Sequence, residues 1–182
     1  MTKSIYLVKS MYSLVKDAMN KIVTIGAYGF NRESFFQNLV DAKIDTFCDI
    51  RRRRGVRGPE YAFANSQYLQ KKLQELGIHY VYIQDLAPSQ AMREKQKQED
   101  EKFHIAKRSR KVLGQTFVSE YIDNCLSRFE PSIFLEKVGP NAQVVCLFCV
   151  ERVPEACHRS LVSSWLTQTF HLPVEHIVPP IV

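Results

Sequence analysis

The sequence predicts an α/β domain built on a mostly parallel sheet of about five strands, with helices on both faces and a helical extension at the N-terminus. Two observations lead to this prediction. Short apolar, β-branched runs alternate with amphipathic stretches along the chain, and this alternation favours parallel strands joined by right-handed helical crossovers. Residues 143–150 also form an unbroken apolar run, which is typical of a central strand covered on both faces.

Composition and length are consistent with one folded domain. The 182 residues are 45% apolar and 24% charged, which is average for soluble globular chains and argues against disorder or a membrane span. We expect an extension over residues 1–20 and a single domain over 21–182. Five cysteines without a recognisable secretory signal favour the reducing cytoplasm.

The elements follow in chain order. Apolar runs that end at turn residues predict strands at residues 22–25, 46–50, 78–83, 143–150 and 174–178. Helical spacing of apolar residues and capping residues predict helices after Asn31, after Asn65 or Ser66, over 117–126 and after Pro154. Gly77 is expected to end the second of these helices in a left-handed conformation. The charged segment 88–114 is expected to be a partly helical insertion over one rim of the fold.

Positive charge is concentrated in two segments. The formal net charge is +6, but residues 51–57 alone carry five arginines and residues 93–111 carry eight bases against four acids. Such clustering predicts a local field that attracts anions, although a solvated surface face explains the second segment equally well. Arg52, Arg53, Arg54 and Arg57 are the candidates for binding nucleic acid.

Polar residues also gather where the predicted strands end. In an open parallel sheet, ligands bind beyond the C-terminal ends of the strands, where backbone N–H groups of the following helices point into a crevice. The candidate anion-binding residues at these positions are Gly26, Tyr28, Gly29, Arg51 and Arg159. The candidate catalytic residues are Asp49, Glu151, Cys157 and His158.

The same turns carry a family resemblance. The segments are Thr-Ile-Gly at 24–26, Asp-Ile-Arg at 49–51, Gly-Ile-His-Tyr at 77–80 and Cys-x-Glu-x-x-Pro-x-x-Cys-His-Arg at 149–159. Together they resemble the domain of unknown function 488 family over about residues 22–178. Leu86-Ala87-Pro88 departs from the glycine that is common in the family after the third strand. The resemblance implies an α/β fold and a candidate site at these turns, without a defined reaction.

The last motif places three reactive side chains at one helix start. If a helix begins near Ala156, then Cys157, His158 and Arg159 occupy its first turn, where the positive end of the helix dipole favours anions and lowers the pKa of a thiol. His158 would serve as acid or base, and Arg159 would bind phosphate. The alternative is structural: a packed cysteine, an imidazole bonded to a backbone carbonyl, and an arginine paired with Glu151 or Asp49.

The two carboxylates have a functional and a structural interpretation. Asp49 beside Glu151 would divide acid and base roles or hold a divalent cation through oxygen ligands. Alternatively, Asp49 and Arg51, which alternation places on one strand face, form a structural ion pair. A zinc site using Cys146 and Cys149 with Cys157 and His158 is disfavoured, because Cys146 and Cys149 lie three apart on a strand and face opposite sides.

Three functions remain open from the sequence. The leading hypothesis is an enzyme acting on a phosphate-bearing substrate, either a nucleotide or a nucleic acid, at the C-terminal rim of the sheet. The first alternative is a nucleic-acid-binding module without catalysis, which would use the two basic segments as a phosphate track. The second is a thiol redox or metal-binding protein, in which Cys149 and Cys157 form a reversible disulfide or contribute ligands.

Overall fold

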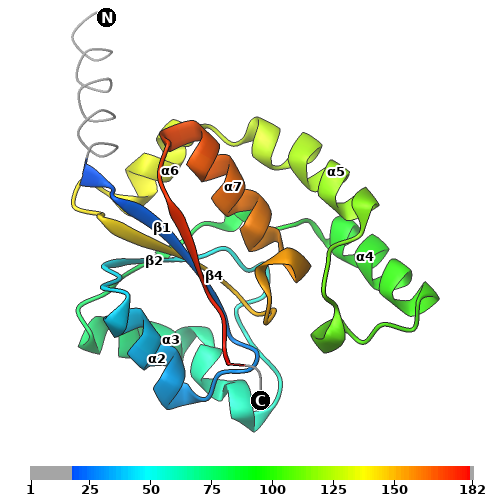
Figure 1. Ribbon diagram of the computed structural model, residues 1–182, viewed down its shortest axis with the longest axis horizontal. Coiled ribbons are helices and arrows are strands. Elements are labelled where there is room, and N and C mark those ends of the chain that lie inside the picture. Colours follow the sequence, from blue (N-terminus) through cyan, green and yellow to red (C-terminus); the bar gives the residue numbers. More distant parts are fainter. Residues whose placement is uncertain (1–17, 181–182) are drawn as a thin grey trace, which may run out of the picture.

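A computed structural model describes residues 18–180, apart from the side chain of Lys107, and confirms the predicted fold class (Figure 1). Within this part of the chain the sheet has five strands, all parallel, in the order β3-β2-β4-β1-β5. The strands are β1 (Lys21–Gly26), β2 (Thr46–Asp49), β3 (His79–Tyr82), β4 (Val144–Cys149) and β5 (Val174–Ile177). The predicted N-terminal extension lies almost wholly outside the described residues.

β4 is the central strand, as its apolar sequence predicts. It pairs with β1 on one side and with β2 on the other, so that Leu147 lies opposite both Thr24 and Cys48. Its residues alternate between two apolar clusters: Val145 and Leu147 belong to one, and Cys146 and Phe148 to the other. A strand that buries both faces needs apolar residues throughout, which explains the uninterrupted run.

Helices cover both faces of the sheet (Figure 1). On one face lie α2 (Arg32–Asp41) and α3 (Ser66–Glu75), which pack Phe35, Leu39 and Leu69 against Phe47 and Phe148. On the other lie α5 (Gln115–Asn124), α6 (Pro131–Val138) and α7 (His158–Phe170). Short 3₁₀ helices connect these elements at Pro59–Ala64, Gln84–Leu86, Lys107–Ser109, Leu126–Arg128 and Pro154–Ala156.

Local signals set the helix ends as expected. The Asn31 side chain accepts a hydrogen bond from the Ser34 amide at 2.8 Å and caps α2. Gly77 follows α3 with a φ of +71°, a conformation that glycine adopts without steric cost. One boundary differs from the prediction: residues 154–156 form a 3₁₀ turn, so Cys157 is extended and α7 begins at His158.

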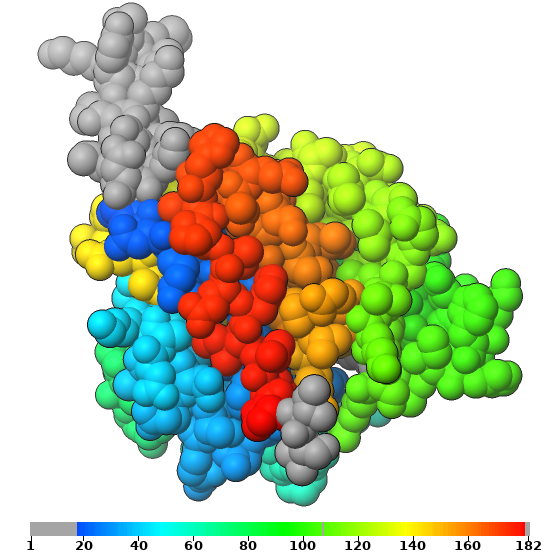
Figure 2. Space-filling view, viewed as in Figure 1, coloured from blue at the N-terminus to red at the C-terminus, as the bar shows by residue number. Residues whose placement is uncertain are grey.

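The charged segment 88–114 contains α4 (Gln90–Lys102), which packs against α5. Figure 2 shows this region (green) as a lobe beside α7 (orange). Ser89 caps α4 through a bond from the Met92 amide at 3.2 Å. None of the helices described is long and apolar enough to cross a lipid bilayer.

Candidate functional site

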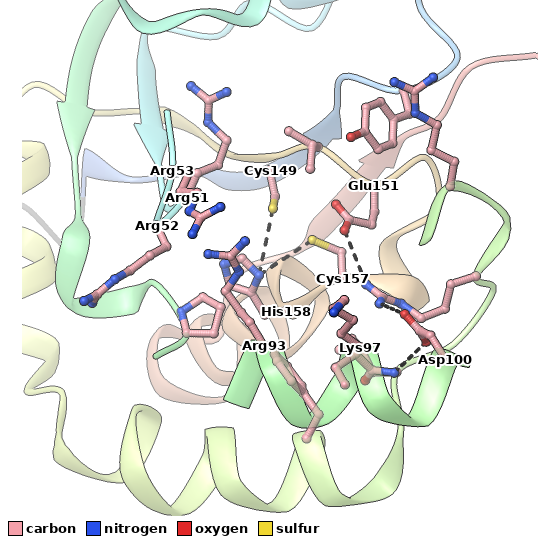
Figure 3. A pocket seen from close by; sticks show the side chains of 18 of the residues that line it. Arg51, Arg52, Arg53, Arg93, Lys97, Asp100, Cys149, Glu151, Cys157 and His158 are labelled. Atoms are coloured by element: carbon pink, nitrogen blue, oxygen red, sulfur yellow. Dashed lines mark hydrogen bonds and ion pairs between the residues drawn. The ribbon is translucent and has the colours of Figure 1, made fainter. Parts of the chain in front are cut away.

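A cavity of about 730 Å³ lies at the C-terminal edge of the sheet (Figure 3). Most of its walls come from three segments far apart in sequence: the loop after β2, helix α4 with the loop that follows it, and the turn after β4. Tyr28 from the loop after β1 and Phe117 from α5 complete the lining. The lining includes Tyr28, Arg51, Arg52, Arg53, Arg57, Arg93, Lys97, Asp100, Arg108, Arg110, Cys149, Glu151, Cys157 and His158. Most of the predicted site residues therefore meet around one hollow.

The walls are strongly basic. Among the described residues, eight arginines and lysines line the cavity against three acids, Glu94, Asp100 and Glu151. Arg52, Arg53 and Arg57 are exposed, and within the described chain they form no ion pair. Arg54, predicted to act with them, instead lies over the Tyr82 ring at 4.3 Å and is not part of the lining. The exposed guanidinium groups of Arg52, Arg53 and Arg57 thus face the cavity.

Two thiols and an imidazole form the buried floor of the cavity. Nδ1 of His158 lies 3.9 Å from Sγ of Cys149 and 3.8 Å from Sγ of Cys157. Nε2 of the same ring lies 3.0 Å from the carbonyl oxygen of Ile50, and the Tyr121 ring packs against the imidazole with centroids 5.5 Å apart. These contacts from β2 and α5 fix the orientation of His158.

The pKa values of the two floor thiols are shifted in opposite directions. Burial alone would raise the pKa of Cys157, but the hydrogen bond from the Cys149 thiol, together with His158 and Arg159, lowers it well below its ordinary value. The hydrogen bond to Cys157 and burial raise the pKa of Cys149 well above the ordinary value. Among the groups that lower the pKa of Cys157, the Cys149 thiol comes first, and the helix-dipole argument did not include it.

Glu151 connects the turn after β4 to the basic side chains of the cavity wall through an ion pair with Arg110. Its Oε1 lies 3.3 Å from Nη2 of Arg110, whose Nη1 is 2.8 Å from Oδ2 of Asp100 on α4. Arg110 also donates to the carbonyl oxygen of Ala156 at 2.9 Å. Its side chain is only 8% exposed. This guanidinium therefore ties α4 to the turn that carries Glu151.

Asp49 does not join Glu151 in a carboxylate pair. Its two oxygens accept from Nε and Nη2 of Arg51 at 2.8 and 2.7 Å, and Oδ2 also accepts from the Tyr80 hydroxyl at 2.9 Å. Asp49 is fully buried and is not among the residues that line the cavity. Arg51 additionally donates to the carbonyl oxygen of Ala64. Both residues take the structural role that the sequence left open, and the expected cation site between Asp49 and Glu151 does not form.

Arg159 is likewise occupied by the protein. It is fully buried, and its Nη1 and Nη2 donate to the carbonyl oxygens of Glu151 and Arg152 at 2.6 and 3.0 Å. It therefore holds the turn after β4 in place and does not line the cavity. The prediction that it binds an anion overlooked these carbonyls, because a sequence does not show where backbone oxygens converge.

The loop after β1 contributes one side chain to the cavity, Tyr28. A Cβ atom on Gly26 would lie 1.8 Å from the carbonyl oxygen of Glu151, so glycine is required there for close packing of two chain segments. Gly29 has a φ of +92°, and its amide donates to the Tyr61 hydroxyl at 3.3 Å. Neither glycine lines the cavity, so the anion-binding role predicted for them has no support in this geometry.

Comparison with known proteins agrees with the motif at the turn after β4. The family model described as Domain of unknown function DUF488 matches residues 31–166. The chain belongs to the DUF488 family. No curated protein and no solved structure matches it.

The DUF488 chain also uses residues that sequence reasoning did not single out. Arg93, Lys97, Arg108 and Arg110 line the cavity, and their only signal in the sequence was the basic excess of segment 93–111. Cys149 was not among the candidate catalytic residues and was considered only as a redox partner of Cys157 or as a metal ligand, and it lies on the floor beside Cys157. It precedes Glu151 by two residues, and alternation along the end of β4 turns both toward the same hollow.

Proposed function

We propose that this protein is an enzyme that binds a phosphate-bearing substrate, a nucleotide or a nucleic acid, in the basic cavity and acts on it at the cavity floor. One observation carries the proposal: the walls supply exposed arginines while the floor supplies a carboxylate, two thiols and an imidazole. Guanidinium groups recognise phosphate oxygens through paired hydrogen bonds. The substrate's reacting group would then face Glu151, Cys157 and His158.

The arginines of the loop after β2 are the proposed phosphate ligands. Arg52, Arg53 and Arg57 are exposed at the cavity, and no carboxylate of the described chain neutralises them. Arg93 and Lys97 extend the same wall from α4. By contrast, Arg51, Arg110 and Arg159 already bind protein groups, so we assign them to building the site.

Glu151 is the proposed proton acceptor. Its side chain is 7% exposed, and it lines the cavity beside the sulfur and imidazole groups. A carboxylate in such a place suits proton transfer to or from a bound substrate or water. The buried neighbour Arg110 holds it in position.

The test compares binding and turnover. A panel of nucleotides and short oligonucleotides is screened by fluorescence anisotropy at several salt concentrations, and the products are analysed by mass spectrometry. We expect binding that weakens as salt rises, and turnover that Glu151→Gln abolishes while binding persists. Glu130→Gln, at an exposed site outside the cavity lining, is the control. Absence of any phosphate-dependent binding contradicts the proposal.

A binding module without catalysis is the second candidate. The aromatic rings of Tyr28 and Tyr61 lie 4.9 Å apart near the cavity, with the Arg108 guanidinium 5.1 and 5.3 Å from them. Such rings stack on nucleic-acid bases while arginines hold the phosphates. In that case Glu151→Gln leaves binding unchanged or strengthens it, and no substrate is converted.

A further inference from the structure

The floor cluster has the composition and geometry of a metal site. Cys149 ends β4, Cys157 is the extended residue directly before α7, and His158 is the first residue of α7, so the three side chains lie on or directly beside regular structure. Their ligand atoms lie within 4.8 Å of one another, and all three residues are buried. Two soft sulfurs with one imidazole form a donor set suited to Zn²⁺, unlike the oxygen ligands that Mg²⁺ and Ca²⁺ require.

The hydrogen bond to Ile50 prepares His158 for this role. A carbonyl oxygen only accepts, so Nε2 of His158 carries the proton and donates it to the Ile50 oxygen at 3.0 Å. Nδ1 then presents its lone pair to the two sulfurs. Histidine ligands in metal sites typically donate their second ring N–H to a carbonyl or carboxylate in this way, which fixes both tautomer and orientation.

The spacing also fits tetrahedral coordination. With Zn–S bonds of about 2.3 Å and a Zn–N bond of about 2.0 Å, a tetrahedral angle separates sulfur from nitrogen by about 3.6 Å. The observed separations are 3.8 and 3.9 Å. A shift of a few tenths of an ångström in the side chains would therefore place both sulfurs and Nδ1 around one ion.

We propose that Cys149, Cys157 and His158 bind one Zn²⁺ ion whose fourth coordination position opens into the basic cavity. All three ligands line that cavity, as does Glu151, so a water molecule or a substrate oxygen would complete the coordination there. Three protein ligands with one open position is the arrangement of catalytic zinc sites, whereas structural sites use four protein ligands. The assignment of a substrate to the open position rests on the function proposed above; the metal site itself does not.

Three roles for the sulfurs of Cys149 and Cys157 can be distinguished by experiment. A metal site keeps both cysteines as thiolates bound to one ion. A nucleophilic Cys157 would stay available to alkylating reagents with the metal present. A redox pair would lose two electrons and two protons to an oxidant and form a disulfide, which removes the ligands.

The first experiment titrates metal-free protein with Co²⁺ under reducing conditions. We expect intense visible absorption bands from tetrahedral coordination and a near-ultraviolet band from thiolate-to-cobalt charge transfer, saturating at one equivalent and abolished by Zn²⁺. Cys149→Ser and Cys157→Ser should weaken Co²⁺ binding at least about 100-fold. Cys125→Ser, at the half-buried cysteine outside the cluster, should bind as the native protein does. Bands that are missing in the native protein, or that survive in Cys157→Ser, overturn the proposal.

The second experiment needs no variant, so misfolding cannot obscure it. Native protein is treated with iodoacetamide with and without one equivalent of Zn²⁺, and alkylation of each cysteine is followed by peptide mass spectrometry. We expect Zn²⁺ to slow alkylation of Cys149 and Cys157 at least about tenfold and to leave Cys125 unchanged. Equal rates with and without Zn²⁺ would falsify the metal site. Neither result depends on phosphate binding, so the two proposals can fail separately.

Discussion

Two carboxylates lie at the same edge of the sheet, but only one of them lines the cavity. Asp49 ends β2 and is enclosed by Arg51 and Tyr80, with a side-chain exposure of 0%. Glu151 follows β4, contacts Arg110 at 3.3 Å, and lines the cavity. Both look alike in the sequence, as an acid after an apolar strand. The comparison shows that an acid at a strand end can be enclosed by neighbouring side chains or can line a cavity, and that its position in the sequence does not distinguish the two.

The pairs differ in what their guanidinium groups do. Arg51 lies two residues from Asp49, and its Nε and Nη2 bind both oxygens of that carboxylate. Arg110 lies 41 residues from Glu151 and divides its bonds among Glu151, Asp100 and the carbonyl of Ala156 in the turn that follows Glu151. The first pair closes the end of one strand. The second joins separate segments, and Glu151 lines the cavity.

The largest effect on stability is expected for Asp49→Ala. The change leaves Arg51 buried without its carboxylate, which typically costs about 3–5 kcal/mol. Urea denaturation measures the loss in the free energy of unfolding. Glu33→Ala, which removes the exposed partner of Arg32, is the control and should leave the unfolding free energy almost unchanged, because solvent screens an exposed pair. Equal, small losses in the two variants would mean that burial of the Asp49–Arg51 pair does not increase its contribution to the free energy of unfolding.

Gly26→Ala tests the packing that holds the turn carrying Glu151. The new Cβ would meet the carbonyl oxygen of Glu151 at 1.8 Å, so the chain must move, at a cost of about 1–3 kcal/mol. Gly55→Ala has its nearest neighbour at 3.8 Å and should change the unfolding free energy little. A Gly26→Ala variant with native stability and native ligand binding contradicts the tight contact.

Glu151→Gln should cost about 1 kcal/mol, less than either change above, because the amide oxygen still accepts from Arg110, and Arg110 keeps Asp100. Thermal and urea denaturation check the stability. The same variant should lose turnover of the phosphate-bearing substrate. A loss of stability as large as that of Asp49→Ala would show that the two carboxylates play the same structural role.

The smallest effect on stability is expected for Arg53→Glu combined with Arg57→Glu. Both side chains are exposed, so the unfolding free energy should change by less than about 0.5 kcal/mol per site. Oligonucleotide binding should fall sharply, and the slope of log K against log salt should decrease by about one for each phosphate contact removed. Lys71→Glu with Arg128→Glu changes the net charge equally outside the cavity. Equal binding by the two double variants rules out specific phosphate contacts at residues 53 and 57.

Several features followed from local sequence. The apolar run of β4, the cap at Asn31 and the glycine after α3 depend on residues close to each other in the chain, so periodicity and capping rules suffice. The gathering of the turns after β2 and β4 around one hollow followed from the rule that parallel strands end at a common edge. The role of Arg159 did not follow, because its carbonyl partners converge only in the folded turn. For Asp49 the sequence offered the ion pair with Arg51 as one of two roles, and contacts in the folded chain decided between them.

The sequence by itself determined the α/β architecture, the central strand, the clustering of positive charge, and the meeting of the turns after β2 and β4 at one edge of the sheet. Only the tertiary structure decided which arginines are exposed at the cavity. That depends on whether a carbonyl or carboxylate from another segment accepts hydrogen bonds from each guanidinium group. It also decided that Cys149, Cys157 and His158 share one point in space. The imidazole of His158 is oriented by the carbonyl of Ile50, which follows β2 and lies 108 positions away in the chain. No local sequence pattern encodes this contact.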